Sequence, residues 1–191
     1  HALSTPVLRL YRTTDVIGAE LGGALKNVIA IAAGVVIGAR LGDSARAAII
    51  TRGFAEMTRL AVRLGARPET LTGLSGLGDL TLTCSSTTSR NMSLGVQLGQ
   101  GSVRSDCFGG KPTVVEGEAN AISVTDLARK LYVPMPICET VRGILHDDQP
   151  ITESFARLWS EPIESEPRAM SLTFAHPTAL AEICTVEERP R

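Results

Sequence analysis

A lysine stands inside a long apolar segment of this sequence, which leaves two interpretations of its role. Lys26 lies ten residues into the stretch 16–40, whose few other polar side chains include Glu20 and Asn27. Lysine is rarely buried without a partner, and burial lowers the pKa of an ammonium group. A lysine shifted in this way can donate and accept a proton near neutral pH. The alternative is a lysine at the one solvent-facing position of a helix, or one whose ammonium group reaches back to water.

A second candidate site is the tripeptide Ser89-Arg90-Asn91, which falls at the predicted start of a helix. The first backbone N–H groups of a helix have no partner within it, and an arginine beside them completes an anion-binding site. A phosphate group would suit such a site. The alternative is an ordinary serine cap followed by an arginine that points into solvent.

Two carboxylates are also candidates. Asp79 follows Gly78 in the apolar sequence LGDL. It could be the charged partner of Lys26, accept a hydrogen bond from a substrate hydroxyl, or cap a helix. Glu116 follows the β-branched residues 113–115 and precedes Gly117. It could accept a hydrogen bond from a ribose hydroxyl or simply begin a helix.

Helical periodicity predicts the elements that must position these residues. Asp15 is placed to cap the helix 16–40, which we expect to be surrounded by protein because it is apolar on every side. The glycines of this helix each cost roughly 1 kcal/mol of helix propensity relative to alanine, which makes sense if other backbones approach closely. These glycines are Gly18, Gly22, Gly23, Gly34 and Gly38.

Further helices are predicted along the rest of the chain. Asp43 or Ser44 would cap a helix that ends near residue 64, and Pro68 opens a short helical turn. The remaining predicted helices cover residues 89–101, 116–131, 137–146 and 150–159, with a loop at 101–112. Residues 7–11 favour one short strand. The sequence therefore predicts an all-α fold of about six helices.

Composition excludes several classes of protein. The 191 residues carry a net charge of −1, whereas nucleic-acid-binding domains usually have a basic excess. The apolar run 28–39 has twelve residues, short of the roughly 20 that a membrane span needs, so we expect a buried helix. The four cysteines form no CxxC pair, and the three histidines show no metal-ligand spacing. We expect reduced thiols in a cytoplasmic protein without a metal site.

Several sequence blocks together resemble a known family. The blocks are VIGAELGGALKNVIAIAAG (16–34), GLGDLTLTCSSTTSRN (76–91), LGVQLGQG (94–101), VVEG (114–117) and VPMPI (133–137). In order and spacing they resemble the C-terminal substrate domain of bacterial NAD(P)-dependent sn-glycerol-3-phosphate dehydrogenases. The resemblance covers residues 4–159. The glycine-rich GLSGLG (73–78) is not a dinucleotide fingerprint, because no βαβ unit surrounds it.

The resemblance implies an enzyme that interconverts dihydroxyacetone phosphate and sn-glycerol 3-phosphate by hydride transfer with NAD or NADP, feeding glycerophospholipid synthesis. It implies an N-terminal Rossmann domain and a C-terminal helical bundle related to that of 6-phosphogluconate dehydrogenase, with the active site between them. On this basis, residues 1–14 are a remnant of the dinucleotide-binding domain, with the strand 7–11 as its last strand. Residues 15–160 are the all-α substrate domain, and 161–191 are a mostly unstructured tail.

The resemblance also implies roles for individual residues. Lys26 is the implied proton donor and acceptor at C2 of the substrate, where an ammonium group stabilises the charge that hydride transfer leaves on the carbonyl oxygen. The phosphate supplies binding energy remote from the reacting carbon, and residues 89–91 are a suitable place for it. The implied substrate contacts are Lys26, Asp79, Ser89, Arg90 and Asn91, and the implied cofactor contacts are Arg90, Val114 and Glu116.

The sequence also departs from the family. It begins at His1 without an initiator methionine and lacks the Rossmann domain, so we expect a fragment that does not turn over substrate alone. The apolar surface left by a missing domain would favour a homo-oligomer. The loop 102–111 also lacks the family pattern. Two alternatives stay open: another β-hydroxyacid-type dehydrogenase, of the 6-phosphogluconate or ketopantoate class, and a non-catalytic helical association domain.

Overall fold

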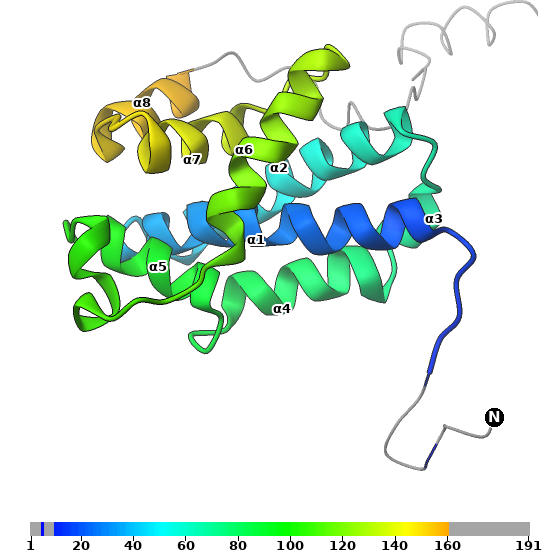
Figure 1. Cartoon of the computed structure of the whole chain (residues 1–191), viewed down its shortest axis with the longest axis horizontal. Helices are drawn as coiled ribbons and strands as arrows, with labels where there is room; N and C mark the ends of the chain where they lie inside the picture. Colours follow the sequence, from blue (N-terminus) through cyan, green and yellow to red (C-terminus); the bar gives the residue numbers. More distant parts are fainter. Residues whose placement is uncertain (1–4, 6–9, 161–191) are drawn as a thin grey trace, which may run out of the picture.

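A computed structural model describes residue 5 and residues 10–160 of the chain, and this part is built from helices (Figure 1). Eight are α-helices, one is a π-helical turn (η1) and one a 3-10 segment (η2). In chain order they are α1 (Val16–Gly38), α2 (Gly42–Arg63), α3 (Pro68–Leu71), η1 (Leu74–Gly78), α4 (Asp79–Ser85), α5 (Arg90–Gly99), η2 (Arg104–Gly110), α6 (Glu116–Lys130), α7 (Pro136–His146) and α8 (Ile151–Ser160). The all-α prediction is confirmed.

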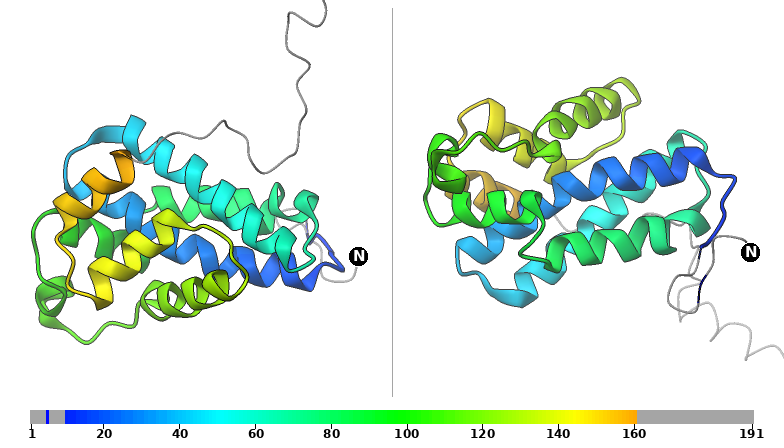
Figure 2. Two further views of the ribbon diagram at one scale, coloured as in Figure 1. Left: turned by 90° about the horizontal axis from the view of Figure 1, so that it is seen from above. Right: turned by 60° about the horizontal axis from the view of Figure 1, so that its bottom comes forward.

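Helix α1 is the centre of the fold, as its composition predicts. The helices α2, α4, α5, α6 and α7 all pack against it (Figure 2). Every residue from 28 to 36 is buried. The predicted cap is present: the Asp15 carboxylate accepts hydrogen bonds from the backbone N–H of Gly18 (2.9 Å) and of Arg67 (2.8 Å). These two bonds, that of Arg67 first, lower the pKa of Asp15. Asp15 thus ties the start of α1 to the segment between α2 and α3.

The length and hydropathy of α1 would also suit a membrane-spanning helix. Among the described helices it is the single candidate, and 67% of its most apolar window is buried inside the protein. Because other helices of the fold cover it, its apolar surface is used in the core.

Two pairs of glycines allow α1 and α5 to pack backbone against backbone. A Cβ atom added at Gly38 would lie 2.1 Å from the Val96 carbonyl oxygen, and one at Gly95 would lie 2.1 Å from the Ile31 carbonyl oxygen. Cβ atoms added at Gly34 and Gly99 would each lie 2.3 Å from a carbonyl oxygen of the facing helix. The predicted close approach of other backbones is therefore confirmed for this part of α1. This contact fixes how α5 lies against α1.

The structure also differs from the sequence-based expectations. Neither Asp43 nor Ser44 caps α2, which begins at Gly42 in a left-handed conformation (φ +88°) after Leu41. Helix α4 was not predicted in the hydroxyl-rich stretch that follows residue 78; there the Thr83 hydroxyl donates to the Asp79 carbonyl (2.7 Å). Within the expected loop 101–112, η2 forms with Phe108 in a left-handed conformation (φ +58°).

Two expectations fall largely on residues that the structure does not describe. Of the predicted strand 7–11, residues 7–9 lie outside the described residues, and residues 10 and 11 have no regular secondary structure. The expected tail 161–191 also lies outside them. The fourth cysteine belongs to that segment, whereas Cys84, Cys107 and Cys138 are buried free thiols.

A buried carboxylate joins α2 to α7. Glu56 is 1% exposed, and its oxygens accept hydrogen bonds from the backbone N–H of Ile137 (2.8 Å) and of Cys138 (3.3 Å). It therefore caps the start of α7, whose own cap position holds Met135 and supplies no side-chain bond. Burial raises the pKa of Glu56 to about 7, although both hydrogen bonds act in the opposite direction.

This buried carboxylate makes the stability of the domain depend on pH. Between the ordinary Glu pKa of 4.5 and about 7, folded Glu56 keeps a proton that the unfolded chain releases. The free energy of unfolding should therefore fall as pH rises through this window and level off above it, by at most about 3 kcal/mol. Melting temperatures at pH 5 and pH 8 should show this fall in the wild-type chain and a smaller one in Glu56→Gln. An equal fall in both proteins would contradict the assignment to Glu56.

Candidate active site

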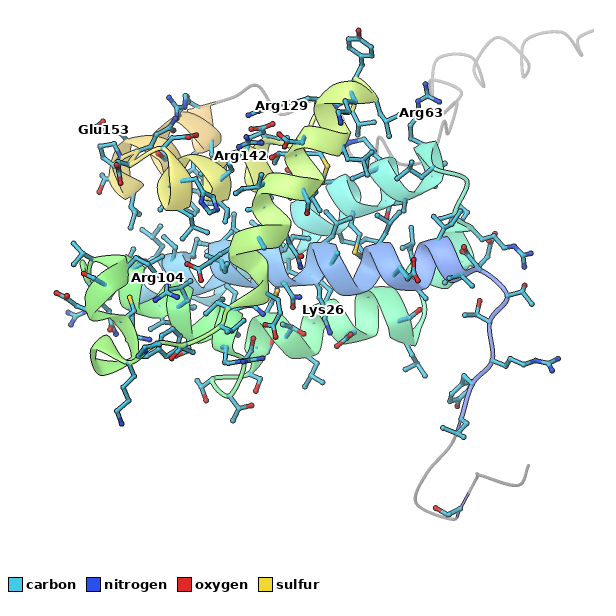
Figure 3. All side chains as sticks on the ribbon, viewed as in Figure 1. Lys26, Arg63, Arg104, Arg129, Arg142 and Glu153 are labelled. Atoms are coloured by element: carbon cyan, nitrogen blue, oxygen red, sulfur yellow. The ribbon has the colours of Figure 1, made fainter. Side chains whose placement is uncertain are left out.

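Lys26 and Asp79, which are 53 residues apart in the chain, form an ion pair between α1 and the first residue of α4. Figure 3 shows Lys26 on the side of α1 that faces α4. The side chains are 21% and 34% exposed, so the pair is reachable from solvent rather than enclosed. This is the partner that the sequence suggested as one of three roles for Asp79. The ammonium group is held in place while keeping a path to a ligand.

The turn before α4 brings Asp79 to Lys26. Residues 74–78 form a single π-helical turn, and such turns are frequent at functional sites. At Gly22, one helical turn before Lys26, an added Cβ would lie 2.5 Å from the Ser75 carbonyl oxygen. The absence of a side chain at Gly22 thus lets η1 lie against α1. The position of Asp79 follows from this contact.

Helix α5 begins at the predicted tripeptide. The Ser89 hydroxyl caps the helix by accepting a hydrogen bond from the backbone N–H of Met92 (3.3 Å). The Arg90 guanidinium donates to Glu116 Oε1 (2.5 Å), at the first residue of α6. The side chains of this pair are 51% and 45% exposed. Arg90 is therefore paired rather than simply solvated, and its guanidinium stays accessible to an anion.

Asn91 connects the starts of α5 and α6 to the turn of α1 that carries Lys26. Its Oδ1 accepts a hydrogen bond from the backbone N–H of Gly117 (2.9 Å), and its Nδ2 donates to Asn27 Oδ1 (3.1 Å). Asn91 is 5% exposed. Because the cap position of α6 is Val115, which has no capping group, Asn91 supplies the cap from a neighbouring helix. A Cβ at Gly117 would lie 2.7 Å from Asn91 Oδ1, so only glycine fits this arrangement.

The structure brings the predicted residues together in two pairs and one network. The pairs are Lys26 with Asp79 and Arg90 with Glu116, and the network joins Asn91 to Asn27 and Gly117. Val114 is 73% exposed, two residues before Glu116. Within residues 10–160 there is no cluster of three or more His, Cys, Asp or Glu side chains suited to a metal ion.

Sequence reasoning missed three residues around the site. Asn27 and Gly117 belong to the buried network, and Asn120 donates from α6 to the Ala24 carbonyl on α1 (3.1 Å). Asn27 carried a usable signal, because it is a second polar side chain next to Lys26 in an otherwise apolar stretch. Gly117 and Asn120 carried none, since their roles depend on where α6 crosses α1.

Comparison with solved structures identifies the class of protein. The fold matches that of a glycerol-3-phosphate dehydrogenase from Coxiella burnetii, with a TM-score of 0.79 and 42% identity over 83% of this chain and 49% of that one. The glycerol-3-phosphate dehydrogenase of Saccharomyces cerevisiae matches with a TM-score of 0.70 and 26% identity, over 79% of this chain and 44% of that one. The chain thus has the fold of the helical C-terminal domain of these dehydrogenases.

Comparison of sequences identifies the family. Residues 15–156 match the family described as NAD-dependent glycerol-3-phosphate dehydrogenase C-terminus, and the chain belongs to this family. A glycerol-3-phosphate dehydrogenase (NAD(P)+) of Caulobacter vibrioides is 55% identical over 87% of this chain and 50% of its own length. One of Cereibacter sphaeroides is 58% identical over 86% of this chain and 52% of its own length. The chain spans about half the length of the curated relatives it matches.

Proposed function

We propose that this chain is the substrate domain of an enzyme that interconverts dihydroxyacetone phosphate and sn-glycerol 3-phosphate. The observation that carries the proposal is the solvent-reachable Lys26–Asp79 pair beside the Arg90–Glu116 pair. An ammonium group and a guanidinium group are what the substrate needs, because it carries a carbonyl at its central carbon C2 and a phosphate at one end.

Lys26 is the proposed general acid and base. In the reduction, its ammonium group faces the carbonyl oxygen at C2, stabilises the negative charge that develops there and delivers a proton to it. Asp79 holds the ammonium group in position and accepts a hydrogen bond from the substrate hydroxyl. In the oxidation, the neutral amine takes the proton back from the C2 hydroxyl.

Arg90 is the proposed phosphate contact. Its guanidinium group lies at the start of α5, where the helix dipole adds to its positive charge. Ser89 and Asn91 are the proposed neighbouring contacts of the same substrate. Glu116 now occupies one side of the guanidinium group, and the exposed remainder is available to the phosphate oxygens.

Residues at the starts of α5 and α6 are the proposed contacts of a nicotinamide dinucleotide. Arg90 offers a cation, Glu116 an acceptor for ribose hydroxyls, and Val114 an exposed apolar side chain. When bound, NADH or NADPH would supply the hydride that C2 receives, and NAD+ or NADP+ would accept it in the reverse reaction. These contacts form only one side of a dinucleotide site, and we therefore propose that the chain alone does not turn over substrate.

The biological setting is also part of the proposal. Production of sn-glycerol 3-phosphate would supply glycerophospholipid synthesis in the cytoplasm. A second copy of the chain is a proposed partner, because several large apolar side chains are exposed. Leu74, Leu82 and Val114 are each more than 60% exposed.

The reaction is tested with a hybrid that joins this chain to the N-terminal half of the Caulobacter vibrioides relative. We expect oxidation of NADH or NADPH that depends on dihydroxyacetone phosphate. We expect no such oxidation with ketopantoate and no reduction of NAD+ or NADP+ with 6-phosphogluconate. Activity with one of those compounds instead would move the chain to a sibling dehydrogenase. Appreciable turnover by the 191-residue chain alone would contradict its proposed dependence on a second domain.

A further inference from the structure

Gly23 is the one glycine of α1 that packing does not explain. The other four each have an atom of the protein within 2.5 Å of an added Cβ: Asp15 Oδ2 at Gly18, and backbone carbonyl oxygens at Gly22, Gly34 and Gly38. At Gly23, the added Cβ would have nothing within 4 Å among the residues that the structure describes. The expected close approach of other backbones is therefore wrong for Gly23, and at Gly18 the neighbouring atoms belong to side chains instead. A glycine inside a helix lowers stability relative to alanine, and at Gly23 no contact with the described residues compensates for that loss.

The position of Gly23 on the helix relates it to the candidate site. Successive residues of an α-helix are rotated by about 100°, so Lys26 lies about 60° to one side of Gly23 and Asn27 about 40° to the other. Side chains of a helix tilt toward its N-terminus, which makes Lys26 and Asn27 lean over the turn that contains Gly23. Lys26 is held on its side by Asp79, and Asn27 on the other by Asn91. Between the side chains of Lys26 and Asn27, the backbone of α1 at Gly23 therefore carries no side chain.

We propose that Gly23 is a specificity-determining residue that forms the floor of the substrate site and leaves room there for the short, unbranched carbon chain of a phosphorylated triose. The proposal rests on the proposed function. A ligand whose carbonyl oxygen faces the Lys26 ammonium must place its carbon atoms next to that group, on the surface of α1. A side chain at position 23 would take that space from the ligand.

The test compares Gly23→Ala with the neighbouring variant Gly22→Ala in the 191-residue chain. For Gly23→Ala, we expect the melting temperature to rise by about 3 °C, because alanine favours the helix and meets no obstacle. The melting temperature of Gly22→Ala should fall, since its Cβ would lie 2.5 Å from the Ser75 carbonyl oxygen. A fall in Gly23→Ala as well would show that the space is filled in solution, and would overturn the proposal.

Ligand binding is measured by NMR titration of the same chain with sn-glycerol 3-phosphate. We expect the dissociation constant to increase about 10- to 100-fold in Gly23→Ala, as when one carbon too many enters a fitted site, and further in Gly23→Val. If the wild-type chain and Gly23→Ala bind the ligand equally well, the proposed role of Gly23 is overturned while the proposed function stands. The space above Gly23 would then be assigned to protein outside this chain. A wild-type chain that does not bind this probe would count against the proposed function itself.

Discussion

Replacing Lys26 with alanine is expected to lower kcat/KM for dihydroxyacetone phosphate by about 1,000-fold in the hybrid enzyme. The substitution removes both the positive charge beside the developing oxyanion and the proton that the product needs, and general acid catalysis alone contributes factors of about 100 to 10,000. Most of the loss should appear in kcat, because the phosphate contacts that hold the ground state remain. Steady-state kinetics with varied substrate at saturating cofactor measure this effect.

Lys130→Ala is the matched control for this prediction. Lys130 is an exposed lysine in the last turn of α6, far along the helix from Glu116. It should keep full activity. Both variants should also keep the wild-type melting temperature within a few degrees. The Lys26–Asp79 pair is partly exposed, and ion pairs in contact with solvent usually add little to stability. An active Lys26→Ala enzyme would assign the proton transfer to another group while leaving the reaction in place.

The central helix, its lysine and the carboxylate Asp79 on α4 could be singled out from the sequence because their signals are local. An apolar segment with one lysine identifies both a core helix and a candidate acid, and Asp79 stood out as a carboxylate in an apolar context. The sequence could suggest that the two groups pair, but it could not establish the contact. The pairing depends on a π-helical turn at residues 74–78, and no residue pattern in the glycine-rich GLSGLG predicted that turn.

The buried network shows why the rest of the site could not be predicted. Asn91 belongs to a tripeptide with the character of an anion site, yet its amide caps α6 and bonds to Asn27. These bonds join residues 26 and 64 positions apart in the chain. Their formation depends on the packing of α5 and α6 on α1, and that information is spread over three helices. The Asn91 side chain therefore holds α1, α5 and α6 in position relative to one another. It also follows the proposed phosphate contact Arg90 directly in the chain.

Replacing Gly95 with alanine should cause a large loss of stability. The new Cβ would lie 2.1 Å from the Ile31 carbonyl oxygen, a backbone atom that cannot turn aside as a flexible side chain can. The helices α1 and α5 must then separate, which we expect to cost about 3 kcal/mol, the upper part of the range for overpacked cores. For a domain of this size, the melting temperature should fall by about 10 °C. Thermal unfolding followed by circular dichroism measures this change.

A double variant that combines Gly95→Ala with Gly38→Ala tests whether the two glycines belong to one contact between α1 and α5 or act independently. Alone, Gly38→Ala should destabilise to a similar degree, because its Cβ would lie 2.1 Å from the Val96 carbonyl oxygen on the same face of α5. Once one alanine has pushed the helices apart, the second meets a wider gap, so the combined loss should be clearly smaller than the sum. Strict additivity would indicate that the two glycines act separately. Because α5 carries Arg90 and Asn91, the same separation should also weaken binding of sn-glycerol 3-phosphate, which would link the glycine contact to the geometry of the site.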